Sequence, residues 1–274
     1  LLLNHKLILG GYLARLLPLL VAVLVFSFGK NKYLNYFLSI LILFSSVIIY
    51  LSGERTAIAL FILFLFLLTI LISRFRIYGI FILIFSFFTI FILTLYDKSI
   101  TENVIDKTIN QVIDFDEGKI NLFSKNHEPL IKNSIRMFFN NPILGVGPNQ
   151  FRNICKYEEY QLTNKICITE PQIDCDCNTH PHNIYIQLLA ETGFIGFSFL
   201  LGTLIYFFSL ILINISKNQM SPNNRLKDFY ILCIISICLT LWPIIPSNNF
   251  FNNWINVIYY LPVGFLLYVS NEKK

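Results

Sequence analysis

Long apolar stretches alternate with short polar segments along most of the chain. Seven of these stretches are near the length of roughly 17–25 residues that a helix needs to cross the hydrocarbon core of a membrane. None has the basic start, short apolar core and small-residue cleavage site of a secretory signal peptide. The pattern predicts an all-α polytopic membrane protein with about seven transmembrane helices. The predicted spans are Tyr12–Phe28, Leu34–Leu51, Ala57–Ser73, Ile77–Leu95, Phe194–Ile215, Phe229–Pro246 and Trp254–Ser270.

The basic residues of the short loops indicate the orientation of these helices, because Lys and Arg gather on the cytoplasmic side of a membrane. If successive spans alternate in direction, all of these residues fall on one side, which we expect to be cytoplasmic. The opposite side then receives the long segment 96–192 as one loop. The basic residues concerned are Lys30, Lys32, Arg74, Arg76, Lys217, Arg225, Lys227, Lys273 and Lys274.

The composition agrees with a membrane protein. Of the 274 residues, 55% are apolar and 14% are charged, and the mean hydropathy is +0.63. A soluble domain carries about a quarter charged residues, so these values argue against a water-soluble enzyme, a disordered chain and a disulfide-stapled mini-protein. The net charge is +5, but the segment from Asp97 to His182 has 12 acidic and 9 basic residues. The excess of +8 outside that segment indicates topology and gives no sign of nucleic-acid binding.

The long loop contains helical patterns of its own. Glu128–Asn140 places Leu130, Ile131, Ile135, Phe138 and Phe139 at helical spacing, with Lys132 and Arg136 interleaved. This predicts an amphipathic helix that lies on the membrane surface or packs over the bundle. Asn141-Pro142 is expected to end it. Tyr96–Gln111 also has helix-like spacing, and Glu117-Gly118 predicts a turn.

Four of the six Cys lie in this loop, at Cys155, Cys167, Cys175 and Cys177. In an oxidising compartment they could form up to two disulfides, with three possible connectivities. Free thiols are a second possibility. A metal site is a third, although one residue between Cys175 and Cys177 is not the usual zinc spacing.

Three motifs on the loop side of the membrane carry candidate chemistry. The first is Leu51-Ser52-Gly53-Glu54-Arg55-Thr56, a charged pair on a tight loop between two apolar spans. The charged pair can be an exposed turn whose Arg reaches the lipid headgroups. Alternatively, Arg55 binds an anion at the membrane surface and Glu54 orients it.

The second motif runs from Arg136 to Asn141-Pro142-Ile143-Leu144-Gly145-Val146-Gly147-Pro148. Its Gly-x-Gly follows no strand and opens no helix, which argues against a dinucleotide site. We interpret the glycines as a turn. Arg136 is either a solvated charge or a side chain that reaches a lipid phosphate.

The third motif is Thr179-His180-Pro181-His182-Asn183-Ile184, which precedes an apolar helix. His182 and Asn183 are expected in the first helical turn, with Glu191 two turns further on. The two His with Glu54 or Asp174 could bind a metal, but His-x-His alone is a weak signal. A His near a helix N-terminus can instead act as a general base or donate to a phosphate. Two Arg and a His pair at one membrane face suit a lipid-linked pyrophosphate, because Arg binds phosphate oxygens bidentately.

On these three motifs the chain resembles the O-antigen ligase and polymerase superfamily of bacterial envelope glycosyltransferases, which have a helical membrane fold. His182-Asn183, Gly193 and Gly196 fit the ligase-like pattern of His-Asn, nine residues, Gly, two residues, Gly. Gly11–Pro18 is similar to a segment that family members carry upstream. The resemblance covers essentially the whole chain. Because family members have more spans and the first residue is Leu1, we expect residues 1–274 to be the C-terminal part of a longer enzyme in the bacterial inner membrane.

The resemblance implies that a glycan is transferred from undecaprenyl pyrophosphate to an acceptor hydroxyl at the periplasmic face, without metal or cofactor. By resemblance Arg55 and Arg136 hold the pyrophosphate, and His182 activates the acceptor or supports the leaving group. Arg15, Glu54, Arg152, His180 and Asn183 are further substrate-binding candidates. The segment 96–192 is then a periplasmic loop.

Two questions stay open. The acceptor can be lipid A–core, as for a ligase, or a growing glycan, as for a polymerase, and the His-Asn pattern favours the ligase. A transporter of lipid or polysaccharide without catalysis is the alternative of another class. Transporters place ionisable residues near the middle of the membrane, whereas the candidate residues of this chain cluster at the ends of its spans.

Overall fold

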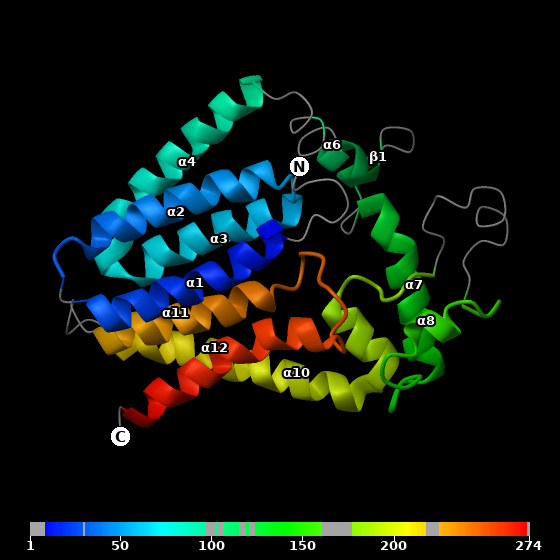
Figure 1. Cartoon of the computed structure of the whole chain (residues 1–274). Helices are drawn as coiled ribbons and strands as arrows, with labels where there is room; N and C mark the ends of the chain where they lie inside the picture. Colours follow the sequence, from blue (N-terminus) through cyan, green and yellow to red (C-terminus); the bar gives the residue numbers. More distant parts are fainter. Residues whose placement is uncertain are drawn as a thin grey trace. The chain divides into compact units, whose positions relative to one another are not determined.

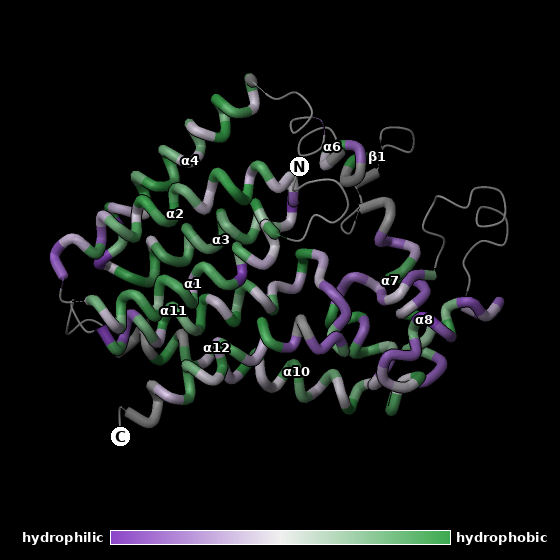
Figure 2. The backbone as a smooth tube through the Cα atoms, viewed as in Figure 1, coloured by the Kyte–Doolittle hydropathy of each residue, from purple (hydrophilic) through white to green (hydrophobic). Residues whose placement is uncertain are grey.

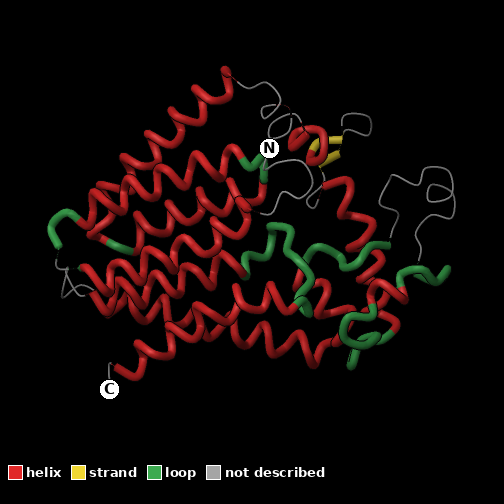
Figure 3. Tube along the Cα trace, in the orientation of Figure 1, coloured by secondary structure: helices red, strands yellow, loops and turns green. Residues whose placement is uncertain are grey.

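The computed structural model describes residues 9–29, 31–96, 102, 107–114, 119–120, 124–160, 177–217 and 225–272. Within these residues the regular secondary structure is helical apart from one short β-hairpin, and loops and turns connect the helices (Figure 3). The chain divides into two compact units. The first comprises Leu1–Asp106, Ser209–Trp242 and Val257–Lys274, and the second comprises Lys107–Phe208 and Pro243–Asn256.

The first unit is a bundle of apolar helices. α1 (Leu9–Phe28) packs against α11 (Arg225–Thr240), α3 (Arg55–Leu71) and α2 (Leu34–Leu51). α2 and α3 also pack against α4 (Arg76–Tyr96), which follows a short 3₁₀ turn at Ser73–Phe75. Figure 1 shows these helices side by side, and Figure 2 shows hydrophobic residues along most of their length. α12 (Asn253–Glu272) contributes its residues from Val257 onward to this unit.

Each of the seven predicted spans contains a helix in the structure, and the helical structure with its long apolar helices confirms an all-α membrane fold. In the described part of the chain, four helices are long and apolar enough to cross a membrane, at Leu9–Phe28, Leu34–Leu51, Ser73–Leu95 and Ile184–Leu210. Two further apolar helices, Arg55–Leu71 and Asn256–Tyr268, are shorter. The chain is therefore a multi-pass membrane protein.

One predicted span ends earlier than expected. We expected the helix that begins near Phe229 to continue to Pro246, but α11 ends at Thr240 and residues 241–252 form irregular chain. Pro243 and Pro246 have no backbone N–H to donate, so they cannot continue the helical ladder. The irregular segment instead contributes to the polar site of the second unit.

The second unit begins with α6 (Lys107–Val112) and a two-stranded hairpin, β1 (Ile113–Asp114) and β2 (Lys119–Ile120). The strands are antiparallel, with Ile113 opposite Ile120. The turn predicted at Glu117-Gly118 lies outside the described residues, as does most of the helical pattern predicted from Tyr96 onward.

α7 (Ser124–Asn140) corresponds to the predicted amphipathic helix and ends where Asn141-Pro142 was expected to end it. Leu130 and Ile131 are buried as predicted. Phe139 is 71% exposed and Ile135 is 37% exposed, so only part of the apolar face packs against the rest of the protein. The helix packs through Leu130 and Met137 into a core that also contains Phe151, Cys155, Tyr160 and Ala190.

α10 (Ile184–Lys217) consists of two helical segments separated by a kink at Gly193, where φ is 62° and ψ is −164°. The second segment begins at Phe194, which is where the sequence predicted the span to start. A short helix, α8 (Phe151–Ile154), lies between the glycine motif and the cysteine-rich segment.

Two of the four loop cysteines are joined in the structure. A disulfide links Cys155, at the end of α8, to Cys177, with the two Cα atoms 5.2 Å apart. This is one of the pairings that the sequence left open. Cys167 and Cys175 lie outside the described residues.

Candidate functional site

The tight loop between α2 and α3 is held against the beginning of α1 by Glu54. Its Oε1 accepts a hydrogen bond from the N–H of Gly10 and its Oε2 accepts one from Gly11, both at 2.9 Å. A carboxylate at this place satisfies N–H groups that the first turn of a helix leaves unpaired, and it interacts favourably with the helix dipole. Burial raises the pKa of Glu54, whereas these two N–H groups and Arg15 oppose that rise. Glu54 thus anchors α1 and does not have the expected role of orienting Arg55.

The glycine pair at the start of α1 makes this approach possible. A Cβ at Gly10 would lie 2.2 Å from the Ser52 hydroxyl oxygen, and one at Gly11 would lie 2.8 Å from Oε2 of Glu54. A larger residue at either position would push the Ser52 hydroxyl or the Glu54 carboxylate away from the helix. The segment from Gly11 to Pro18, which the sequence singled out by resemblance, therefore meets the first motif in space.

Arg15 lies next to this anchor. Its Nη1 donates to the Gly11 carbonyl oxygen at 3.0 Å, and its charge interacts with Glu54. The carbonyl oxygen of Arg15 accepts a hydrogen bond from the Ser236 hydroxyl on α11 at 3.1 Å. Arg15 is half-buried. Because its charge interacts with Glu54, it belongs to the same polar cluster.

Arg55 is the first residue of α3 and is half-buried. Within the described residues it makes no hydrogen bond or ion pair, and α3 has no side chain that caps its N-terminus. A cation at the N-terminus of a helix is electrostatically unfavourable, because the helix dipole is positive there. Helix stability therefore does not explain Arg55, but an anion bound to it would.

Three of the four histidines of the chain come together in the second unit. His127 lies on α7, and His180 and His182 lie in the segment that leads into α10. The rings of His127 and His182 are stacked, with centroids 4.8 Å apart and planes at 23°. The rings of His180 and His182 have centroids 4.2 Å apart. We call this arrangement the histidine stack, with His182 as its central ring.

The backbone presents His182 in an unusual conformation. Its φ is 56°, in the left-handed region that few residues other than Gly adopt. Its carbonyl oxygen accepts a hydrogen bond from the N–H of Ser247 at 2.8 Å. His182 and Asn183 were expected in the first turn of the helix, but α10 begins at Ile184, so both precede it.

Asn183 caps α10 and joins it to the irregular segment after α11. Its Oδ1 accepts hydrogen bonds from the N–H groups of Tyr185 and Ile186 at 3.0 and 3.1 Å. Its Nδ2 donates to the carbonyl oxygen of Pro243 at 2.9 Å. Asn is among the best N-cap residues for this reason. The buried Asn183 side chain therefore positions His182, and its polar atoms are used within the protein.

His180 is the buried member of the histidine stack. Burial, followed by the neighbouring His182, lowers the pKa of His180 to about 3, although the backbone of Ser247 opposes the shift. Arg152 and His127 add positive charge nearby and lower the pKa further. His180 is therefore neutral at neutral pH, and the cationic surroundings favour an anion at this place.

The glycine motif docks against the kink of α10. Val146 and Gly147 donate backbone hydrogen bonds to the carbonyl oxygens of Ala190 and Glu191, at 3.0 and 2.9 Å. Gly145 has a φ of 68°, and a Cβ there would lie 2.4 Å from the backbone of Glu191. A Cβ at Gly193 would lie 2.3 Å from the carbonyl oxygen of Ile143. The second and third motifs thus fit together through glycines, and the glycines form turns as interpreted from the sequence.

A buried polar network ties the same helix to two other segments. Both oxygens of Glu191 accept from backbone N–H groups, with Phe151 at 2.7 Å and Asn149 at 3.0 Å. Gln187 donates to Glu191 at 3.1 Å and to Asn249 at 2.8 Å. Neither Gln187 nor Asn249 is among the site residues predicted from the sequence. Asn183, Gln187 and Glu191 recur every four residues, and this polar stripe on an apolar helix is the signal that could have found the network.

The other predicted site residues lie at the surface of the second unit. Arg136 is exposed on α7. It follows His127 by nine residues, which at about 100° per residue places the two side chains on opposite faces of the helix. Arg152 is exposed and donates from Nη2 to Oδ1 of Asn149 at 2.8 Å. On α7 it is therefore His127 that contacts His182. Arg136, the residue of this helix that the sequence predicts for the site, lies on the opposite face.

No three His, Cys, Asp or Glu side chains are grouped as metal ligands within the described part of the chain. Asp174, which the sequence considered as a metal ligand, lies outside it. The described polar groups are cations, the neutral imidazole of His180 and carboxylates that already accept backbone N–H bonds. This arrangement suits the binding of an anion.

The motifs lie in the part of the chain that matches a known protein family. No curated protein and no solved structure matches the chain. The family model described as O-antigen ligase matches residues 40–201, which include Arg55, the glycine motif, the histidine stack and Gly193. The match covers more than half of the 274 residues. The chain therefore belongs to the O-antigen ligase family.

Proposed function

We propose that this protein transfers a glycan from undecaprenyl pyrophosphate to an acceptor hydroxyl at the periplasmic face of the inner membrane, as an O-antigen ligase does. Membership of the family supports a membrane protein of the ligase or polymerase type. The donor, the acceptor and the roles of individual residues are the proposal. The first two of the three sequence motifs contain the candidate cations, Arg55 and Arg136.

The unpaired cation at the start of α3 carries the proposal. Arg55 has no partner within the described residues, and the first N–H groups of α3 have no side-chain cap. A pyrophosphate oxygen could accept hydrogen bonds from the guanidinium group and from these N–H groups together. The position of Arg55 at the end of a span also suits a lipid-linked pyrophosphate, because the lipid tail lies in the bilayer and the charged pyrophosphate lies at the membrane surface.

In the proposed reaction, the acceptor hydroxyl oxygen forms a bond with the anomeric carbon of the donor. The bond from that carbon to the pyrophosphate oxygen breaks, and undecaprenyl pyrophosphate leaves with the electron pair. Fixed cations that stabilise the charge of the leaving group are the main source of acceleration for such a step. We assign this role to Arg55 and Arg136. His182 accepts the hydroxyl proton, or it supports the leaving group while that proton passes to the departing pyrophosphate oxygen; His180 is neutral and buried beside it.

The test uses the purified full-length protein, a lipid-linked glycan donor and lipid A–core as acceptor. Arg55→Ala, Arg136→Ala and His182→Ala are each expected to lower kcat about 10²–10³-fold, the usual cost of removing one group that stabilises the transition state. Arg55→Lys keeps the charge but loses the bidentate fork, so it should recover only part of the activity. Arg76→Ala, at the start of α4, is the matched control. Full transfer by all three alanine variants would overturn the proposal.

His127→Phe belongs in the same panel, because the stack places His127 beside His182. Phe retains a flat ring against His182 but removes the imidazole nitrogens. A loss of kcat in His127→Phe with normal activity in Arg136→Ala would assign the second anion-binding group to His127. The opposite result would keep Arg136 in that role.

The products distinguish the members of the superfamily. Lipid A–core capped with glycan identifies a ligase, and a lengthened lipid-linked glycan identifies a polymerase. Absence of both products with a folded protein would favour the transporter.

A further inference from the structure

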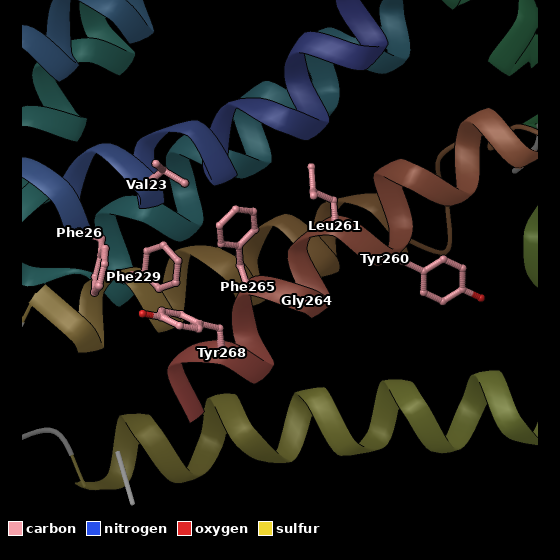
Figure 4. A pocket seen from close by; sticks show the side chains of 8 residues that line it. All are labelled: Val23, Phe26, Phe229, Tyr260, Leu261, Gly264, Phe265 and Tyr268. Atoms are coloured by element: carbon pink, nitrogen blue, oxygen red, sulfur yellow. The ribbon is translucent and has the colours of Figure 1, made fainter. Parts of the chain in front are cut away.

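An apolar groove runs along the first unit. It has a volume of about 520 Å³ and is lined by α1, α11 and α12. That volume lies within the range of roughly 300–1,000 Å³ of small-molecule pockets. Figure 4 shows Phe26 of α1, Phe229 of α11 and Phe265 of α12 along its wall. The rings of Phe26 and Phe229 lie 5.2 Å apart, and those of Phe229 and Phe265 lie 6.0 Å apart.

One wall of the groove is open to the surroundings of the bundle. Tyr260 and Tyr268 of α12 line it and are 60% and 53% exposed, and Leu261 is 42% exposed. Gly264 leaves a gap in the same wall, because a Cβ at this position would have no atom within 4 Å. A lipid chain could therefore enter sideways from the bilayer and lie against the aromatic rings.

Cationic side chains gather at one end of the groove. Arg225, the first residue of α11, lies one turn before Phe229 and donates from Nη1 to the carbonyl oxygen of Phe26 at 3.4 Å. Arg74 donates from Nη1 to the carbonyl oxygen of Gly29, just beyond α1, also at 3.4 Å. Lys227 and the buried Asp228 lie at the same end, and the charge of Asp228 interacts with Arg74 and Lys227. Three cations and one carboxylate leave an excess of two positive charges.

We propose that this groove is a binding site for an anionic phospholipid, with an acyl chain against the aromatic wall and the phosphate at Arg225. A guanidinium group has five N–H donors, and in the described residues Arg225 uses one of them in a long hydrogen bond. The other donors can bind phosphate oxygens bidentately. The loops that bear these cations are the ones expected to be cytoplasmic, and that leaflet is rich in anionic lipid. The site is separate from glycan transfer and does not depend on the proposed function.

A groove between loosely packed helices would also hold lipid from the surrounding membrane, but it would not prefer an anionic headgroup. The experiment therefore measures charge selectivity, by native mass spectrometry of the full-length protein in detergent with equimolar phosphatidylglycerol and phosphatidylcholine. The wild-type protein is expected to retain phosphatidylglycerol preferentially. Arg225→Gln should weaken phosphatidylglycerol binding about fivefold, the effect of one basic residue near an anionic headgroup. It should leave phosphatidylcholine binding unchanged.

A second variant tests the apolar part of the site. Gly264→Leu places a side chain in the open gap of the groove without a clash, so it should reduce the binding of both lipids. Gly202→Leu on α10 is the matched control, because a Cβ there also has no atom within 4 Å. Arg76→Gln is the control for loss of one basic residue. The melting temperature of each variant in detergent confirms that it is folded.

Two results would overturn the proposal. One is equal retention of the two lipids by the wild-type protein. The other is wild-type lipid binding by folded Arg225→Gln and Gly264→Leu proteins. Neither measurement uses a glycan substrate, so the lipid site can fail or hold independently of glycan transfer.

Discussion

At the scale of single residues, the carboxylates beside the candidate groups serve the fold. Glu54 accepts from Gly10 and Gly11, and Glu191 accepts from Asn149 and Phe151. A buried carboxylate is costly unless donors surround it. Backbone N–H groups supply these donors for both carboxylates, so each is satisfied within its own unit.

His180 gives a pH dependence that can be measured. Its pKa is lowered to about 3 by burial, whereas a His in the unfolded chain titrates near 6.5. Between these values the unfolded chain binds more protons than the native one, so stability falls as the pH falls through this window. We expect the melting temperature of the protein in detergent to decrease from about pH 7 to about pH 4.5. His180→Gln should reduce that decrease, and an equal pH dependence in both proteins would contradict the prediction.

At the scale of elements, the kink of α10 and the glycine motif form one unit of structure. Gly145 and Gly193 both have positive φ, and each approaches the backbone of the other segment too closely for a Cβ. The kink allows Phe194 and Ile195 to donate to the carbonyl oxygens of Pro142 and Ile143. The spacing from His182-Asn183 to Gly193 is therefore the length from the helix cap to the docking point of the glycine motif.

This docking predicts a contrast between two glycines of the same helix. Gly193→Ala should destabilise the protein by at least about 2 kcal/mol, because Ala is strained at positive φ and its Cβ meets the Ile143 carbonyl. Gly202→Ala lies in open space within regular helix and should leave stability unchanged or slightly raised. Thermal unfolding in detergent measures both. Equal melting temperatures for the two variants would show that the docking contributes little.

At the scale of the whole molecule, the disulfide bears on topology. Disulfides persist in oxidising compartments, so the Cys155–Cys177 bond accords with the expectation that segment 96–192 faces the periplasm. The two residues are 22 positions apart, and the bond also fixes α8 beside the segment that leads to the histidine stack.

Peptide mapping without reduction, on protein from membranes, is expected to find Cys155 linked to Cys177. Replacing both by Ala should destabilise the protein by about 3 kcal/mol, the usual contribution of a cross-link that closes a loop of this length. A linked peptide that joins Cys155 to Cys167 or Cys175 would contradict the observed pairing. Free thiols at both positions would argue against an oxidising environment.

The sequence by itself determined the helices and their class, because helical periodicity and long apolar runs are local properties. It located the start of the second part of α10 at Phe194, the end of α7 at Asn140 and the turns at Gly145 and Gly147. It also selected Arg55 and His182 from motif spacing. It predicted too long a helix for α11, because the apolar pattern continues past Pro243, where the helical hydrogen bonds cannot continue.

Only the tertiary structure decided which residues meet. Glu54 binds Gly10 and Gly11 more than forty positions away, and Gln187 meets Asn249 at a separation of 62. His127 stacks on His182, while Arg136 lies on the other face of the same helix. Such pairings depend on how elements pack: a polar residue on an apolar helix can be noticed in the sequence, but the pattern along the chain does not name its partner. The sequence thus selected the candidate residues from local motifs, and the packing of distant segments decided which side chains lie together and which of them hold the structure.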